Sequence, residues 1–96
     1  MTGQHILILG GASDIGQAVA RRFAQEGYNV QLAARDVGRL EPDRSDIALR
    51  GNVDVTLHKF DALQPQTFEA FFDNLPSLPQ IVVSAVGVLG DQSLDE

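Results

Sequence analysis

Apolar residues along the chain follow two spacings, one typical of strands and one typical of helices. Residues 6–9 are four consecutive aliphatic residues, as in a parallel strand covered on both faces. From Asp14 the apolar residues recur at the spacing of a helix packed on one face: Ile15, Ala18, Val19 and Phe23. We predict this helix over residues 14–26, ending before Gly27. A strand over residues 29–34 then completes a right-handed βαβ unit.

The middle of the chain is less regular. Pro42 is expected to interrupt any helix, which leaves a short helix over residues 45–51. Residues 53–58 alternate apolar and polar, and this alternation predicts a strand at the sheet edge with one side in water. Residues 60–62 close that strand.

The last third contains one more helix and one more strand. The helix begins after Pro65, which suits a first-turn position, and ends at Pro76 and Pro79. We expect its apolar stripe to pack in the core; the stripe is Phe68, Phe71, Phe72 and Leu75. Residues 81–86 predict a fourth buried strand, and Gly87 opens a loop.

The turn at residues 10–16 joins the first strand to the first helix. This geometry aims backbone N–H groups at an anion, and the positive end of the helix dipole attracts a phosphate. Gly10 suits the sharp exit from the strand, and Gly16 lets the helix approach the sheet. The middle glycine of a G-x-G-x-x-G pattern is replaced by Ser13 or Asp14, depending on the alignment. The turn is therefore interpreted as a pyrophosphate cradle.

Ser13 and Asp14 differ in what they offer a phosphate. The Ser13 hydroxyl can donate a hydrogen bond to it. The Asp14 carboxylate would repel it, unless that carboxylate turns away and caps the helix.

Two charged residues follow later strands at the edge where open α/β sheets bind ligands. Arg35 stands where an NAD-specific site would place a carboxylate for the ribose 2′-hydroxyl, and its guanidinium matches a phosphate. NADP is thus favoured over NAD, although Asp36 would reverse the preference if it turned inward. Asp61 can accept from an adenine amino group, or it can cap the next helix.

Composition narrows the class of partner. The formal net charge of −6 argues against nucleic acid or anionic membranes as main partners. No apolar run approaches a membrane span, and residues 1–9 do not form a secretory signal. The chain has no cysteine, as is compatible with a cytoplasmic protein. His58 lies on a polar register without neighbouring ligand residues, so we expect no metal site.

With these residues in place, the chain resembles the N-terminal half of the short-chain dehydrogenase/reductase family. Residues 9–16 are similar to that family's cofactor motif T-G-x-x-x-G-x-G, with Leu9 in place of the threonine and Asp14 in place of the middle glycine. Residues 84–87, Ser-Ala-Val-Gly, occupy the place of its N-N-A-G motif. Ser13 between Gly10 and Gly16 also resembles the extended, epimerase-type branch, whereas the segment at Gly87 favours the shorter branch.

The resemblance implies a function and a set of site residues. It implies the NADP-binding portion of an oxidoreductase acting on a carbonyl or alcohol. Gly10, Ala12, Ser13 and Ile15 would hold the pyrophosphate. Arg35 would hold the 2′-phosphate and Asp61 the adenine. Ala85 and Gly87 would line the path to the nicotinamide. The full set of cofactor-binding positions is Gly10, Ala12, Ser13, Asp14, Ile15, Gly16, Arg35, Asp61, Ala85 and Gly87.

The family's catalytic residues are absent from these 96 residues. They are a serine and a Tyr-x-x-x-Lys motif on the two elements after the fourth strand. Here the sole tyrosine, Tyr28, is followed four residues later by Leu32, and the sole lysine is Lys59. We therefore expect no hydride transfer by this chain alone. Two alternatives remain: a non-catalytic dinucleotide-binding or sensor module, and a structural α/β layer in which Asp14 blocks the phosphates.

The predicted fold is a single α/β domain over residues 1–96 with a Rossmann-like parallel sheet. The expected strand order is 3-2-1-4, with helices on both faces. This order leaves the strand at 81–86 as an exposed apolar edge, which needs a covering strand. We expect either a fragment of a longer enzyme or a homo-oligomer that pairs through this edge.

Overall fold

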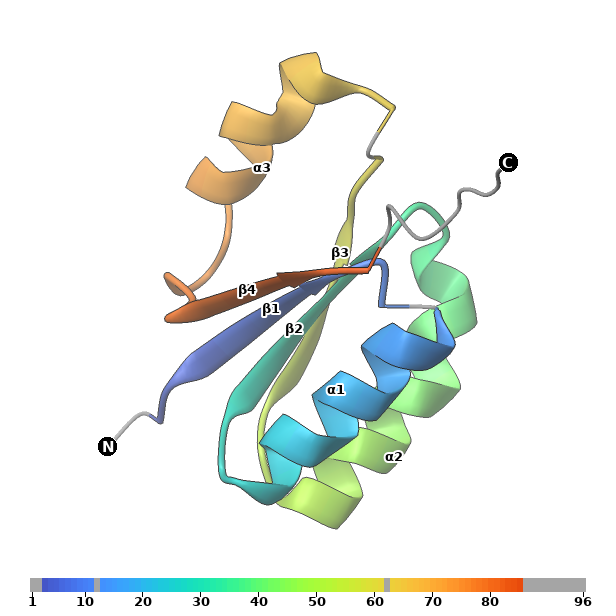
Figure 1. Cartoon of the computed structure of the whole chain (residues 1–96), viewed down its shortest axis with the longest axis vertical. Coiled ribbons are helices and arrows are strands. Elements are labelled where there is room, and N and C mark those ends of the chain that lie inside the picture. Colours follow the sequence, from blue (N-terminus) through green and yellow to red (C-terminus); the bar gives the residue numbers. More distant parts are fainter. Residues whose placement is uncertain (1–2, 12, 62, 86–96) are drawn as a thin grey trace.

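The computed structural model describes residues 3–11, 13–61 and 63–85, and it contains the predicted parallel sheet (Figure 1). The strands are β1 (His5–Leu9), β2 (Asn29–Ala34), β3 (Val55–Lys59) and β4 (Ile81–Ser84), in the order β3-β2-β1-β4. All three pairings are parallel. The predicted fold class and strand order are thus confirmed.

Helices cover both faces of this sheet, as predicted (Figure 1). Helices α1 (Asp14–Gln25) and α2 (Glu41–Gly51) lie on one face, and the 3₁₀ turn η1 (Val37–Leu40) leads into α2. Helix α3 (Phe68–Asp73) lies on the other face and follows the 3₁₀ turn η2 (Pro65–Thr67). No helix in the described part of the chain is long and apolar enough to cross a bilayer; the longest, α1, has 12 residues.

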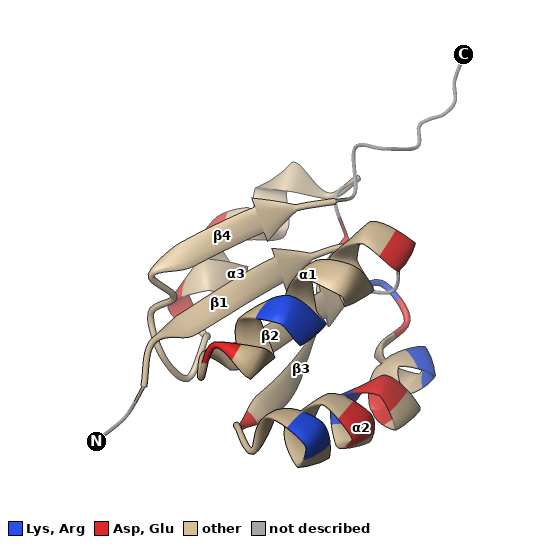
Figure 2. Cartoon of the chain, turned by 60° about the horizontal axis from the view of Figure 1, so that its bottom comes forward, with Lys and Arg blue, Asp and Glu red and all other residues tan. Residues whose placement is uncertain are grey.

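The central strands are buried because both of their faces are covered. Ile6, Leu7 and Ile8 are fully buried: Ile6 and Ile8 belong to the core under α1 and α2, and Leu7 to the core under α3. Figure 2 shows the strands almost free of charged residues. The four-residue aliphatic run is therefore explained by a strand between two apolar layers.

Only part of the predicted apolar stripe of α1 packs against the core: Val19 and Phe23 do, whereas Ile15 and Ala18 do not. Its buried residues are Gly16, Ala20 and Ala24, whereas Ile15 is 54% exposed and Ala18 is also exposed. These fully buried residues are small, so the helix packs close to the sheet, with Val19 and Phe23 at the side of the contact. The prediction that Ile15 and Ala18 face the core is wrong, because hydrophobic spacing did not weigh side-chain size.

Helix α2 is longer than predicted, because Pro42 does not interrupt it. Pro42 lies in the first turn, where no N–H is needed and a fixed φ is favourable. Glu41 and Asp43 in the same turn complement the helix dipole. The helix ends at Asn52, whose φ of 54° is in the left-handed region. The expectation of a short helix over residues 45–51 is therefore corrected.

The two edge strands and α3 also differ from the predicted pattern. Strand β3 lies at a sheet edge as predicted but begins at Val55. Strand β4 is only half-buried, with alternating exposure and Val82 50% exposed, because β1 is its only described neighbour. Helix α3 ends at Asp73, before the prolines.

The aromatic stripe of α3 packs against Phe60 and Leu7 through Phe68, Phe71 and the following Leu75. Phe72 is the exception to the prediction: it is 36% exposed, and its ring lies edge-on against Phe71 at 5.2 Å. Three of the four positions therefore belong to the core.

An ion-pair cluster links α1 to α2. Arg21 of α1 contacts Asp46 and, at 3.6 Å, Asp43, while Arg50 donates to Asp46 at 2.7 Å. The hydrogen bonds from Arg50 and Arg21 lower the pKa of Asp46 below its usual value. The charged side chains between α1 and α2 therefore form ion pairs with one another.

The burial of α2 predicts an asymmetric response of two neighbouring aliphatic residues. Ile47 is 1% exposed and Leu49 is 82% exposed on the same helix. Ile47→Val should lower the free energy of unfolding by about 0.5–1.5 kcal/mol, measured by urea denaturation, because it opens a small void. Leu49→Val is the matched control and should stay within about 0.5 kcal/mol. Equal losses in the two variants would contradict this packing of α2.

Candidate functional site

The turn after β1 is fixed to the end of β2. Gly10 has a φ of 87°, in the left-handed region where glycine is favoured. The N–H groups of Gly10 and Gly11 both donate to the carbonyl of Ala33, at 2.8 and 2.9 Å. The chain therefore leaves β1 sharply and stays at the carboxyl edge of the sheet, as predicted for Gly10.

Ser13 closes this turn and begins α1. Its Oγ accepts from the N–H of Gly16 at 2.9 Å, which makes Ser13 the N-cap. Its hydroxyl donates to the carbonyl of Gly10 at 2.9 Å, and its own N–H donates to the same carbonyl at 3.0 Å. The N–H and hydroxyl of Ser13 are thus engaged within the turn. Asp14, the other polar residue here, is exposed in the first turn of α1 and is not the cap.

Gly16 is the point of closest approach between α1 and the turn. A Cβ at this position would lie 2.6 Å from the Gly10 carbonyl oxygen and 3.3 Å from Cγ2 of Ile8. The first distance is too short for any side chain, and the obstacle is backbone that cannot move aside. The predicted role of Gly16 in close helix–sheet packing therefore has a direct steric basis.

The first turn of α1 leaves donors available. The N–H groups of Asp14 and Ile15 make no hydrogen bond to a described residue, as expected for the first turn of a helix. Ile15 is also largely exposed. These two amides and the helix dipole can therefore act on an anion near the turn.

Gln17 contacts the turn and was not singled out from the sequence. Its side-chain Nε2 donates to the carbonyl of Gly11, and its Oε1 is buried without a hydrogen-bond partner among the described residues. The available signal was a polar side chain one residue beyond the last glycine. Gln17 thus positions the second glycine of the turn.

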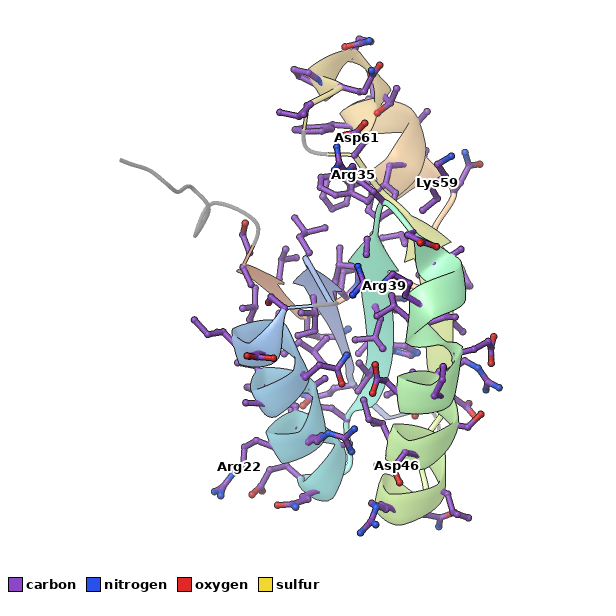
Figure 3. The ribbon with its side chains drawn as sticks, turned by 90° about the vertical axis from the view of Figure 1, so that its right-hand side faces the viewer. Arg22, Arg35, Arg39, Asp46, Lys59 and Asp61 are labelled. Atoms are coloured by element: carbon purple, nitrogen blue, oxygen red, sulfur yellow. The ribbon has the colours of Figure 1, made fainter. Side chains whose placement is uncertain are left out.

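Arg35 and Asp61 come from the ends of neighbouring strands. Ala34 of β2 lies opposite Lys59 of β3, and the N–H of Phe60 donates to the carbonyl of Ala34 at 2.9 Å. Arg35 and Asp61 follow directly, and Figure 3 shows them together above the sheet. Arg35 and Asp61 therefore lie at the carboxyl edge of the sheet, where the glycine turn also lies.

Two carboxylates near Arg35 have local roles. Oδ1 of Asp61 accepts from the N–H of Leu63 at 2.9 Å, so Asp61 supports the turn before η2. It does not cap the next helix as the alternative predicts, because Gln64 and Thr67 are the N-cap residues of η2 and α3. The Asp36 carboxylate lies near Gly38, where an added Cβ would be 3.5 Å from Oδ1. Asp36 thus sits on the η1 side of Arg35.

Ala85 joins the same edge. It is 3% exposed, and its N–H donates to the carbonyl of Leu9 at 2.8 Å, directly before the glycine turn. Ala12 and Gly87 lie outside the described residues. Gly10, Ser13, Asp14, Ile15, Gly16, Arg35, Asp61 and Ala85 thus all lie at the carboxyl edge of one sheet.

His58 is the penultimate residue of β3, and its side chain packs on the face of the sheet that α3 covers. Its ring packs edge-on against Phe71 with centroids 6.3 Å apart, and Nε2 is 2.8 Å from the Thr56 hydroxyl. Burial lowers the pKa of His58 below its ordinary value. Among the described residues no group of three His, Cys, Asp or Glu side chains could hold a metal ion.

The partly buried His58 predicts a pH effect on stability. Because its pKa is lower in the folded state, the unfolded chain takes up the proton first as the pH falls below about 6.5. The stability that comes from keeping the His58 imidazole neutral is complete above about pH 6.5. It is lost as the pH falls through the pKa of His58 in the folded protein. An NMR titration should give His58 a pKa below 6.5 that rises in Phe71→Ala. An unchanged value in that variant would contradict packing as the cause.

The steric contact at Gly16 predicts that alanine is tolerated less well at this position than at Gly38. Gly16→Ala should destabilise the protein by about 1–3 kcal/mol in urea denaturation, because the methyl group meets a backbone oxygen. Gly38→Ala is the matched control, because its nearest contact is the Asp36 side chain at 3.5 Å. Tolerance of alanine at both positions would show that α1 does not approach the turn this closely.

Comparisons with known proteins give a consistent assignment. Residues 4–92 match the family model described as short chain dehydrogenase. An uncharacterized oxidoreductase of Streptomyces coelicolor is 36% identical over 94 residues, which cover 95% of this chain and 37% of that protein. An uncharacterized oxidoreductase of Mycobacterium bovis is 38% identical over 90 residues, which cover 93% of this chain and 23% of that protein.

Solved structures share the fold and carry nicotinamide cofactors. An alcohol dehydrogenase of Thermococcus sibiricus, complexed with 5-hydroxy-NADP, is 33% identical with a TM-score of 0.67 over 73% of this chain and 30% of that one. A short-chain dehydrogenase of Sphingobium yanoikuyae, in complex with NADPH, is 33% identical, with a TM-score of 0.64. The match covers 70% of this chain and 26% of that one.

The 96 residues therefore span only 23% to 37% of the length of these four proteins. The residues matched by the family model include the glycine turn, Arg35, Asp61 and the Ser-Ala-Val-Gly segment at residues 84–87. The chain belongs to the short-chain dehydrogenase family.

Proposed function

We propose that this chain is the NADP-binding portion of an oxidoreductase that acts on a carbonyl or alcohol. The observation that carries the proposal is the convergence at one sheet edge of the glycine turn, the first-turn amides of α1 that have no described acceptor, and the exposed guanidinium of Arg35. Ligands in open α/β sheets bind outside the carboxyl ends of the strands. The related Thermococcus and Sphingobium proteins, which bind 5-hydroxy-NADP and NADPH, support the choice of cofactor.

The residues present fit a dinucleotide. The Gly16 position has no space for a Cβ, so the helix start stays close to the turn and its amides reach the pyrophosphate. The N–H groups of Asp14 and Ile15 donate to it. Gly10 and Ser13 shape the turn rather than donate, because the Ser13 hydroxyl and N–H are already bonded to the Gly10 carbonyl.

Three further positions orient the rest of the cofactor. Arg35 binds the 2′-phosphate, and Asp61 accepts from the adenine amino group with the carboxylate oxygen that Leu63 does not use. Ala85, beside Leu9, lines the path to the nicotinamide, together with Gly87 of the proposed site. When bound, the cofactor supplies or accepts the hydride.

The acid and base that complete the reaction are proposed to come from outside these 96 residues, because no Tyr-x-x-x-Lys occurs in them. The same observation favours a second candidate, a non-catalytic dinucleotide-binding module. Consumption of NADPH with small ketones or aldehydes distinguishes the enzyme from the module, since only the enzyme oxidises the cofactor.

We further propose that the free edge of β4 is covered by another strand, from the same protein or a second copy. Half-buried apolar residues on an edge that has no partner strand among the described residues support this pairing. The absence of cysteine fits a cytoplasmic location.

The cofactor assignment predicts a selective effect of Arg35→Ala. We expect NADPH binding to weaken by about 1.5–3 kcal/mol, measured by isothermal titration calorimetry, because a charge-assisted hydrogen bond to the 2′-phosphate is removed. NADH, which lacks that phosphate, should bind almost as before. Unchanged NADPH affinity would refute the role of Arg35, and NADH preference in the unmodified protein would move the specificity to Asp36.

A further inference from the structure

The positive charges of this chain fall into two groups. All seven Lys and Arg side chains lie in the described residues, and four of them, Arg21, Arg22, Arg44 and Arg50, form ion pairs on α1 and α2. The other three, Arg35, Arg39 and Lys59, form no ion pair with a described residue. These three are all exposed, and all lie at or just beyond the carboxyl ends of β2 and β3.

This distribution is informative in a chain with a net charge of −6. Paired charges on the helix face cancel locally and leave little field. Cations without a partner keep their field, and a cluster of them at one edge attracts an anionic ligand. The carboxyl edge is therefore the part of the described chain where cations have no ion-pair partner, although Asp14, Asp36 and Asp61 lie at the same edge.

Arg39 is held in place by its short element. It lies in η1, whose next residue, Leu40, is 1% exposed and anchors the turn in the core. The N–H of Arg39 donates to the carbonyl of Asp36 at 3.3 Å. In Figure 3 its side chain extends from η1 toward the side where α1 and the glycine turn lie, below Arg35.

We propose that Arg39 is the second guanidinium of the 2′-phosphate site, acting together with Arg35. The inference rests on the proposed function, and it names a residue that the sequence did not mark. A phosphate monoester carries a charge of about −1.5 to −2 and three acceptor oxygens near neutral pH. A single guanidinium leaves part of this charge and at least one oxygen unmatched.

Counting charges shows why Arg35 alone is insufficient. Asp36 directly follows Arg35 and is exposed, so these two residues sum to zero. Arg39 makes the segment from residue 35 to residue 39 net +1. Arg39 is thus the residue that makes this segment attractive to a phosphate despite Asp36.

Lys59 is assigned a different place. It borders a hollow of about 410 Å³ together with Asp61, Gln64 and Thr67, on the outer strand β3. Neither Arg35 nor Arg39 lines this hollow. We therefore leave Lys59 out of the guanidinium pair.

Isothermal titration calorimetry with NADPH and NADH tests the proposal on the purified protein. Arg39→Gln keeps much of the aliphatic stem and removes the charge. We expect it to weaken NADPH binding by about 5- to 20-fold and NADH binding by less than about 2-fold. The salt dependence of NADPH affinity should also decrease, because one cation fewer faces the phosphate. Arg39→Lys keeps the charge but lacks the planar fork of donors. Its NADPH affinity should lie between those of the unmodified protein and Arg39→Gln.

Arg22→Gln is the matched control. It removes an equally exposed guanidinium from the opposite end of α1, where Arg22 pairs with Glu26 at 3.4 Å (Figure 3). Both cofactor affinities should be unchanged in this variant. A general effect of net charge would instead weaken NADPH binding in both arginine variants and would overturn the proposal.

The remaining outcomes separate the inference from the proposed function. If Arg35→Gln weakens NADPH binding and Arg39→Gln does not, the inference is overturned and the proposed function stands. If Arg39→Gln weakens NADPH and NADH equally, Arg39 does not read the 2′-phosphate and the inference is again overturned. If the unmodified protein binds neither cofactor, the proposed function fails and the inference fails with it.

Discussion

The contact between Gly16 and the carbonyl oxygen of Gly10 is the constraint on which the rest of the site depends. A Cβ at Gly16 would lie 2.6 Å from that oxygen, so α1 reaches this depth only because the side chain is absent. Ser13 then bonds to both glycines and holds the turn closed. The start of α1 and its two unengaged amides are thereby fixed at the carboxyl edge of β1.

The arrangement of charge follows from the same architecture. On the outer face of α1 and α2, arginines and carboxylates pair with one another, and these exposed pairs contribute little net field. At the carboxyl edge, the chain leaves β2 and β3 through turns whose cations have no such partner among the described residues. An acidic protein thus presents cations without a described ion-pair partner, alongside the carboxylates of Asp14, Asp36 and Asp61, beside a turn shaped for phosphate.

The sequence predicted the sheet well because its signals were strong and local. The aliphatic run at residues 6–9 and the glycines after it define a strand and a turn with few alternatives. The strand order and the covering of both faces also agree with prediction. What could not be predicted depended on side-chain size and on position within a turn. Helix α1 buries alanines rather than Ile15, and Pro42 begins α2 instead of breaking a helix.

The conformational roles of Gly10 and Gly16 were predictable because only glycine meets the steric requirement there, whereas the role of Arg35 in binding stays a prediction. Gln17 and Arg39 were missed because their relevance arises from where a neighbouring element turns. Gln17 contacts Gly11 only because α1 begins so close to the turn, and Arg39 reaches the edge only because η1 folds back after Asp36. Such contacts have no fixed spacing in the sequence.

The central claim is that the first turn of α1 and the end of β2 bind a phosphorylated dinucleotide. An NMR titration of backbone amides with NADPH tests this claim most directly, because it reports the location of binding without requiring catalysis. The account predicts that the largest shift changes occur at Asp14, Ile15 and Arg35, with little change at Asn52 and Val53 at the opposite end of the sheet. Changes confined to that opposite end, or no changes at saturating NADPH, would contradict it.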